Sequence, residues 1–178
     1  MRQVAANYRC ELLQKHHDRS TFSCGNAELD RYIHAQAGQD QKRGVAAPYV
    51  LVEIATGTLV GYYTLSATSV SLVDLPAPIV KRLPRYPTVP ATLLGRLARD
   101  ARYRGRGVGE LLLSNAVRHS YRIAREIASI GVIVDAIDDT ARAFYEQYGF
   151  ARLPEQGYRL VLPMSAIREL FVIAEQDG

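Results

Sequence analysis

The hydrophobic residues of this chain recur with a period of two in some segments and of three to four in others. Residues 8–15 have one apolar side and predict a first strand. Helical spacing of apolar side chains predicts a helix over residues 27–42, which Asn26 is placed to cap. Residues 48–54 and 59–70 are rich in β-forming residues and are joined by a Thr-Gly-Thr turn, so they predict a hairpin.

The second half of the chain alternates strand and helix patterns. An apolar strand from Leu93 leads through an arginine and glycine loop into a helix that begins near Val108, with an apolar side continuing to Ile127. Further on, the pattern predicts a buried strand over 131–137, a helix over 140–148 capped by Asp138 or Asp139 and ended by Gly149, strands over 150–153 and 158–162, and a helix over 165–174 capped by Ser165. This order predicts a single α/β domain over residues 1–178, with a mixed central sheet flanked by helices.

Residues 73–90 interrupt the alternation with five prolines. Because proline excludes regular strand and helix here, we expect an irregular connection. A long loop of this kind is either a lip beside a substrate site or only a surface connection.

The composition is that of a soluble domain able to bury a core, with 48% hydrophobic and 22% charged residues in 178. No signal-peptide pattern stands at the start, and no stretch approaches the roughly 20 apolar residues of a membrane helix, so we expect no membrane association and a cytoplasmic location. Cys10 and Cys24 have no metal-ligand spacing, and we expect reduced thiols and no metal site.

Positive charge is concentrated in residues 81–125. This segment has eleven Lys or Arg and only two acidic residues, a net charge of +9, whereas the whole chain carries +4. The remainder is therefore net negative, at −5. Such an asymmetry indicates a polyanionic ligand larger than a carboxylate.

The loop over residues 102–109 has the chemistry of a phosphate site. Glycines at positions 105, 107 and 109 let backbone amides approach a ligand, and the helix that follows directs its free amides and its dipole at the same place. The dinucleotide-binding fingerprint is excluded because Glu110 stands where it needs a third glycine, and no Walker Gly-Lys-Ser/Thr sequence occurs.

The pattern Arg104-x-x-Gly107-x-Gly109 between a strand and a helix resembles the pyrophosphate-binding loop of the GNAT acetyltransferases. The resemblance implies that acetyl-CoA is the co-substrate. Its implied binding residues are Leu97, Ala98 and Arg99 on the preceding strand and Arg104, Gly105, Arg106, Gly107, Val108 and Gly109 in the loop. In this family the backbone of that strand holds the pantetheine, and an amide of Leu97 or Ala98 would polarise the thioester carbonyl.

Residues 141–150, ARAFYEQYGF, resemble a second GNAT signature. The resemblance implies that Tyr145 is the catalytic acid that protonates the departing thiolate of coenzyme A, with Tyr148 as the second candidate. Asp138 stands where the family often has Asn. Because neither cysteine lies near a signature, direct transfer in a ternary complex is expected instead of an acyl-cysteine intermediate.

A narrower resemblance, to the GNAT toxins of bacterial toxin–antitoxin pairs, covers nearly the whole chain. It is carried by FSCGNAELDRYIHAQAGQDQKRG, LVGYYTLSATSV, LLGRLARDARYRGRGVG and FYEQYGF. It implies acetylation of the α-amino group of aminoacyl-tRNA, which blocks translation. It also implies inhibition by a ribbon-helix-helix antitoxin and a homodimer.

The tRNA is expected to meet Arg96 and a stripe on the helix after the loop, which includes Arg118, Arg122 and Arg125. The stripe is otherwise a solvated face. Glu53 is either a buried general base or a carboxylate on the outer face of the sheet, and His34 is expected to be partly exposed on its helix.

Three alternatives stay open. The first is an acetyltransferase for a protein N-terminus or lysine, which should have a neutral or acidic peptide groove. The second is an acetyltransferase for a small amine, and the third a non-catalytic module that binds acetyl-CoA or nucleic acid. A phenol at Tyr145 disfavours the third, since binding alone does not need it.

Overall fold

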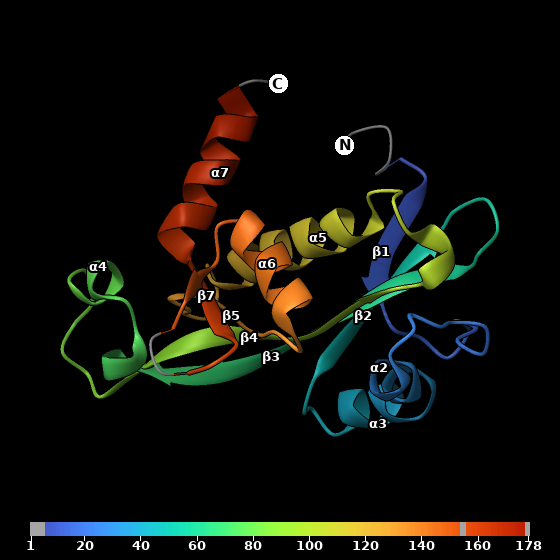
Figure 1. Ribbon diagram of the computed structural model, residues 1–178, viewed down its shortest axis with the longest axis horizontal. Coiled ribbons are helices and arrows are strands. Elements are labelled where there is room, and N and C mark those ends of the chain that lie inside the picture. The colour runs from blue at the N-terminus through green and yellow to red at the C-terminus, as the bar shows by residue number, and fades with distance from the viewer. Residues whose placement is uncertain (1–5, 154–155, 177–178) are drawn as a thin grey trace. The chain divides into compact units, whose positions relative to one another are not determined.

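The computed structural model describes residues 6–153 and 156–176, with side chains only as far as Leu170 in the last helix. The strands form one mixed sheet in the order β1-β2-β3-β4-β5-β7-β6, in which β4 and β5 are parallel (Figure 1). The strands are β1 Tyr8–Leu12, β2 Ala47–Glu53, β3 Leu59–Ser71, β4 Thr88–Arg99, β5 Gly131–Asp135, β6 Ala151–Arg152 and β7 Arg159–Pro163. The helices are α2 Ala27–Arg31, α3 Ala37–Lys42, α4 Ala77–Val80, α5 Val108–Ile123, α6 Asp139–Gln147 and α7 Met164–Gln176, with a π-helix η1 Tyr32–Gln36 and 3₁₀ turns η2 Leu72–Asp74 and η3 Ala101–Tyr103. The expected α/β fold is confirmed.

The chain divides into two compact units. The first comprises Met1–Ser66 and Gly95–Ala116, and the second comprises Ala67–Leu94 and Val117–Gly178. The boundary falls within β3, β4 and α5, so each of these elements contributes residues to both units.

In the first unit, the helical segment from α2 to α3 packs on the sheet. Asn26 accepts hydrogen bonds from the amides of Glu28 and Leu29 at 3.0 and 3.1 Å and caps α2 as predicted. The predicted helix over 27–42 is confirmed, although its middle part, η1, is a π-helix. The buried cluster beneath it is Leu13, Phe22, Tyr32, Ile33, Ala37, Val50, Val52, Leu59, Tyr62 and Ala98.

Gly61 lets the start of α5 approach the sheet closely. A Cβ on Gly61 would lie 2.6 Å from Cδ1 of Leu112 and 3.0 Å from the carbonyl oxygen of Ala98. Leu112 and Val108 are both 0% exposed. The absence of a side chain at Gly61 therefore fixes the first turns of α5 against β3 and β4.

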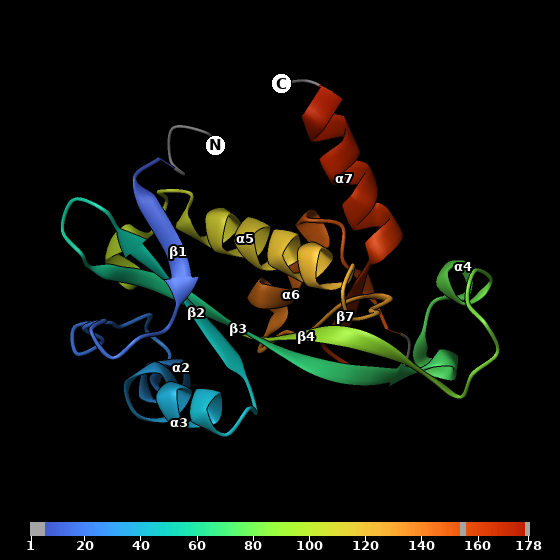
Figure 2. The ribbon, with the colours of Figure 1, turned by 180° about the vertical axis from the view of Figure 1, so that it is seen from behind.

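In the second unit, β5 is the buried centre, with residues 131–134 all buried. Its pairing with β7 is antiparallel. The accompanying core cluster is Val70, Leu75, Val89, Ala91, Ile133, Leu153 and Val161. Figure 2 shows the ends of β3 and β4 running side by side into the segment that carries α4.

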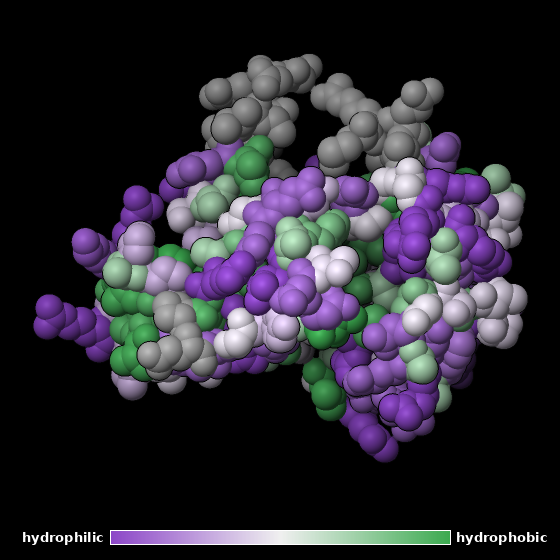
Figure 3. Space-filling view, in the orientation of Figure 1, coloured by the Kyte–Doolittle hydropathy of each residue, from purple (hydrophilic) through white to green (hydrophobic). Residues whose placement is uncertain are grey.

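A hollow of about 360 Å³ lies between the α4 segment and the start of α7, lined by Ile79, Arg82, Leu83, Ile130 and Pro163 among others. Figure 3 shows hydrophobic residues gathered at the end of this unit that carries α4. None of the described helices combines the length and apolar character that a membrane crossing needs.

The expectation of no regular structure in residues 73–90 is wrong. Pro76 is the N-cap of α4 and Pro78 lies in its first turn. Proline is tolerated there because the first amides of a helix have no intrahelical partner. Pro90 lies near the start of β4, where its carbonyl accepts a hydrogen bond from the amide of Ile130 at 2.9 Å.

The helix after the loop is shorter than predicted. α5 ends at Ile123, and the amides of Arg125 and Glu126 bond to carbonyls three residues back, which tightens the chain into turns. Ile127 is 70% exposed instead of belonging to the apolar side of the helix. Arg125 consequently lies outside the helix on which the sequence placed it.

Two boundaries near the end of the chain also differ from the prediction. β5 stops at Asp135, and Ile137 is 60% exposed. Ser165 lies inside α7 and does not cap it, because α7 begins at Met164, whose amide donates to the carbonyl of Ile130 at 2.9 Å. Asp138 does cap α6, by accepting from the amide of Ala141 at 2.7 Å.

Candidate acyl-transfer site

A buried carboxylate, Asp100, anchors the start of the arginine and glycine loop. Only 1% of Asp100 is exposed, and it accepts hydrogen bonds from the amide of Ser23 at 3.2 Å and from the amide and guanidinium of Arg102 at 2.8–2.9 Å. Burial alone would raise the pKa of Asp100, but these hydrogen bonds outweigh it and hold the pKa below its usual value. The carboxylate thus caps η3 and fixes the direction in which the loop leaves β4.

Two glycines of the loop have a backbone conformation that other residues rarely adopt. Gly105 has φ +72° and Gly107 has φ +74°. Arg104 and Arg106 are exposed, and the Arg106 guanidinium lies 5.1 Å from the centroid of the Tyr103 ring. The loop therefore presents two cations, and a glycine backbone that a ligand can approach closely, directly before the first turn of α5. The free amides of that turn favour an anion.

The end of β4 lies beside this loop in the same unit. Ala98 is 4% exposed and belongs to the core cluster, whereas Leu97 and Arg99 are half-buried on the opposite face of the strand. Arg99 donates to the carbonyl of Asp100 at 3.3 Å. The six loop residues and the three strand residues that the resemblance assigns to acetyl-CoA are thus brought together in the first unit.

Glu53 helps to hold the loop. Its Oε2 accepts a hydrogen bond from the Tyr103 hydroxyl at 3.1 Å and another from the Thr56 hydroxyl at 2.7 Å. These bonds give Glu53 a structural part in joining the hairpin to η3. His34 is exposed, as expected, and its ring donates to the carbonyl of Phe22 at 3.0 Å.

Arg96 stacks on an aromatic ring of the π-helix. Its Cζ lies 3.7 Å from the ring centroid of Tyr32. Tyr32 is 1% exposed, and its hydroxyl is the one buried side-chain polar atom without a hydrogen-bond partner among the described residues. The helical spacing of apolar residues predicts that Tyr32 faces the core. It does not predict that Arg96, on β4, stacks on the Tyr32 ring.

Tyr145 lies on α6 in the second unit and is 8% exposed. Its ring packs edge-on against Phe144 and Phe150, with centroids 5.5 and 5.4 Å apart. Burial raises the pKa of the phenol well above 10, so Tyr145 is protonated at neutral pH. Tyr148, the other candidate acid, is half-buried and packs on Phe144 at 5.0 Å.

The predicted arginine stripe is only partly a helical feature. Arg118 and Arg122 are exposed on α5, whereas Arg125 lies in the turns beyond its end. His119 also lies on α5. Burial, and to a smaller extent the charge of Arg122, lowers the pKa of His119, so this imidazole adds no charge at neutral pH. All three arginines belong to the second unit.

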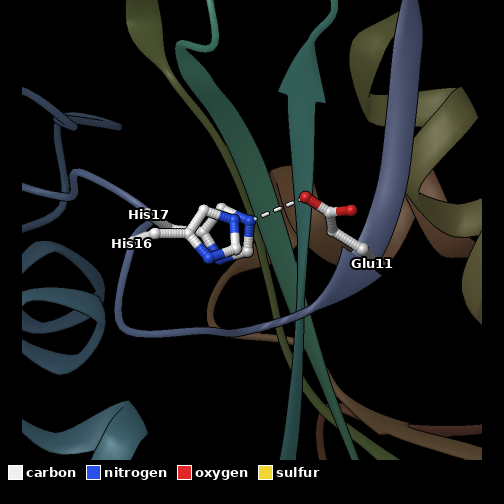
Figure 4. Close-up of side chains that lie close together, drawn as sticks. All are labelled: Glu11, His16 and His17. Carbon is white, nitrogen blue, oxygen red and sulfur yellow. Dashed lines mark hydrogen bonds and ion pairs between the residues drawn. The ribbon is translucent and has the colours of Figure 1, made fainter.

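Glu11, His16 and His17 bring three ligand atoms within 4.8 Å of one another, which is the geometry of a possible metal site (Figure 4). Nδ1 of His17 accepts the amide of Gln14 at 2.8 Å, so the ring proton sits on Nε2, which donates to Glu11 at 2.8 Å. A metal-bound histidine normally donates its other ring nitrogen instead of accepting there. These hydrogen bonds hold the segment that carries His16 and His17 against β1, and they oppose metal binding.

Neither cysteine has the surroundings of a reactive thiol. Both are free and half-buried. Burial raises the pKa of Cys10, and burial together with a hydrogen bond to Asp30 raises that of Cys24 to about 11. Both side chains are therefore thiols at neutral pH and weak nucleophiles.

Comparisons with known proteins identify relatives of this chain. Residues 49–152 match the family described as acetyltransferase (GNAT) domain. A probable toxin TacT of Sinorhizobium fredii is 33% identical, with 86% of this chain and 89% of that protein covered. A tRNA-acetylating toxin of Mycobacterium tuberculosis is 34% identical, with 86% and 90% covered.

Solved structures give the same relationship. The toxin AtaT in complex with acetyl-methionyl-tRNAfMet superimposes with a TM-score of 0.86 at 26% identity, covering 92% of this chain and 99% of that one. The AtaTR complex bound with acetyl-CoA has a TM-score of 0.81 at 25% identity, covering 93% and 99%.

Proposed function

Because this chain belongs to the GNAT acetyltransferase family, we propose that it takes the acetyl group of acetyl-CoA and transfers it to the α-amino group of an amino acid carried by tRNA, which blocks translation. The similarity over 86% of the chain to a toxin named for acetylating tRNA is the observation that carries this proposal. The +9 charge of residues 81–125 supports it, since tRNA needs more cations than coenzyme A alone.

We assign acetyl-CoA to the end of β4 and the loop before α5. The loop backbone at Gly105 and Gly107, with the cations of Arg104 and Arg106, suits a pyrophosphate at the start of a helix. The amide of Leu97 or Ala98 would stabilise the charge that develops on the thioester oxygen. When bound, acetyl-CoA supplies an activated acyl group with a good leaving thiolate.

Tyr145 is the proposed general acid. As the amine nitrogen bonds to the acetyl carbon, the carbon–sulfur bond breaks and the leaving thiolate takes the phenol proton of Tyr145. The phenol is protonated at neutral pH and so has a proton to give, and the direction of its pKa shift means that the transfer depends on close placement of the leaving sulfur. The amine gives up its proton to solvent, and the Tyr145 phenolate takes a proton back from solvent, which restores the free enzyme. An ester-linked amino acid favours the loss of the amine proton because the pKa of its amine is lowered.

Transfer is proposed to be direct, without an acyl-cysteine. The raised pKa values of Cys10 and Cys24 support this mechanism, since a thiolate is the form that would accept an acetyl group.

Arg96, Arg118, Arg122 and Arg125 are the proposed tRNA contacts. We further propose a ribbon-helix-helix antitoxin as partner, a homodimer as the assembly and the cytoplasm as the location, all of which rest on the sequence resemblance to the GNAT toxins of toxin–antitoxin pairs. Light scattering of the purified protein, alone and after expression with the gene that neighbours its own, tests the assembly and the partner.

The function is tested by incubating purified protein with labelled acetyl-CoA and a pool of charged tRNA, with uncharged tRNA and a protein extract as controls. We expect label on the charged pool alone, and digestion then identifies the amino acid. Label on protein, or on neither RNA sample, would contradict the tRNA assignment and leave an acetyltransferase with another acceptor.

A further inference from the structure

The guanidinium of Arg96 is held in place without an anion beside it. The side chain is half-buried, and among the described residues it has no carboxylate partner and no hydrogen bond, only the ring of Tyr32 at 3.7 Å. Arg102, a few residues along, is instead neutralised by Asp100 at 2.8 Å. A half-buried arginine whose donors meet no carboxylate in the described part of the chain is suited to an anionic ligand from outside the protein.

The ring under Arg96 is rigidly fixed. Tyr32 stacks on Tyr62, with centroids 6.1 Å apart and an angle of 22° between the rings. The Tyr62 hydroxyl donates to the carbonyl of Leu29 at 2.8 Å, which ties the two stacked rings to α2. The π-helix begins at Tyr32, whose carbonyl accepts the amide of Ala37, five residues on.

The hydroxyl of Tyr32 does not explain why a tyrosine stands here. Among the described residues no atom meets the geometry of a hydrogen bond to it. Burial, with a smaller contribution from the nearby Asp40 carboxylate, raises its pKa to about 12, so it is neutral. A buried hydroxyl without a partner destabilises a fold. The contribution of Tyr32 to the site therefore lies in its ring face, which attracts a guanidinium.

The position of Arg96 connects it with acyl transfer. It lies on β4 next to Leu97 and two residues before Ala98, on the same face of the strand as Ala98. The phosphates of coenzyme A are already assigned to the loop at residues 104–109, which leaves the acceptor as the source of an anion near the thioester.

We infer that Tyr32 is a positioning residue, which holds the Arg96 guanidinium ready to bind a backbone phosphate at the 3′ end of the tRNA. This inference rests on the proposed function, and it adds the residue that orients the contact. Arginine on a fixed aromatic face loses little side-chain freedom when the phosphate arrives, so binding of the acceptor is strengthened.

The test compares Tyr32→Leu, Tyr32→Phe and Arg96→Gln with the wild-type protein in steady-state transfer. Tyr32→Leu and Arg96→Gln should raise the KM for charged tRNA about tenfold while the KM for acetyl-CoA stays unchanged. Tyr32→Phe keeps the ring and should behave as wild type. The double variant Tyr32→Leu/Arg96→Gln should be no worse than Arg96→Gln, because the two residues act as one unit.

Arg31→Gln is the matched control, because Arg31 directly precedes Tyr32 and is an exposed cation without an aromatic partner. It should leave both KM values unchanged. An unchanged KM for charged tRNA in Tyr32→Leu would overturn the inference, and so would an equal loss in Tyr32→Phe. A parallel rise in the KM for acetyl-CoA would assign Arg96 to the cofactor.

Binding of uncharged tRNA, followed by fluorescence anisotropy at several salt concentrations, separates this inference from the proposed function. Loss of the Arg96 phosphate contact should lower the slope of log affinity against log salt by about one. An unchanged slope would overturn the inference even if the protein acetylated charged tRNA. A lowered slope would support the contact even if the transfer assay failed.

Discussion

Tyr145, the proposed general acid, is the residue on which the proposed transfer step depends most directly. Replacing Tyr145 by Phe keeps the packing with Phe144 and Phe150 and removes only the proton donor. We expect kcat to fall about 10²- to 10⁴-fold while acetyl-CoA binding, measured by calorimetry, is unchanged. The corresponding change at Tyr148 is the control. If Tyr148→Phe were the slower enzyme, the acid would be Tyr148.

Asp100 is expected to govern stability in a pH-dependent way. Its pKa is lower in the folded than in the unfolded chain, so its ionised form stabilises the fold above the unfolded pKa of about 3.9 and this contribution is lost as the pH falls through the folded pKa. Asp100→Asn should reduce the free energy of unfolding by about 2 kcal/mol at pH 7. Urea denaturation should show the difference from wild type shrinking below about pH 4.

The matched variant for this experiment is Asp18→Asn. The carboxylate of Asp18 is exposed, and Ser20, two residues on, is its one hydrogen-bond donor among the described residues. We expect a much smaller change in stability there. Equal losses at the two positions would mean that burial of Asp100 and its bonds to Arg102 are not what holds the loop.

At the scale of elements, the loop before α5 depends on its backbone. Gly105 and Gly44 have similar φ values of +72° and +69°, and neither has an atom within 4 Å of the place a Cβ would take. Changing either to Ala should therefore cost about 1 kcal/mol of stability through backbone strain alone. Only Gly105→Ala should also raise the KM for acetyl-CoA. An equal rise in Gly44→Ala would contradict the assignment of the cofactor to the loop before α5.

The end of α5 divides the arginine stripe into two parts. Arg118 and Arg122 lie on the helix, whereas Arg125 follows it in a turn. The double variant Arg118→Gln/Arg122→Gln should weaken tRNA binding and flatten its salt dependence, while leaving the KM for acetyl-CoA unchanged. Arg125→Gln should have the smaller effect. Filter binding with uncharged tRNA measures both, and full activity of the double variant would make the stripe a solvated face.

The pattern of apolar residues predicted most elements, because each amphipathic element faces one core. It placed the helix over 27–42, the β2–β3 hairpin and the start of α5 correctly. It failed where local hydrogen bonds decide the backbone conformation, because the spacing of apolar residues does not report them. The turns after Ile123 and the proline-capped α4 are examples. The glycines predicted the loop before α5, whose binding role stays a prediction. Asp100 and Tyr32 were missed because their partners are distant in sequence or carry no motif.

For the whole molecule, the sharing of β3, β4 and α5 between the two compact units bears on how it unfolds. If β3, β4 and α5 unfold in one unit, the other unit loses part of the same strands and helix. We therefore propose that residues 1–178 behave as one domain and unfold in a single transition. Circular dichroism and tyrosine fluorescence should give coincident thermal curves, and two separate midpoints would contradict this.

The π-helix also restricts how the segment from Ala27 to Lys42 can change during evolution. It holds one residue more per turn than an α-helix would, and this extra residue sets the rotation of Tyr32 relative to α3. Deleting a single exposed residue, such as Ala35, would convert the wide turn into an α-helical turn and change how the Tyr32 ring is presented to Arg96. Loss of one residue from this segment would therefore leave a continuous helix but disturb the support under Arg96.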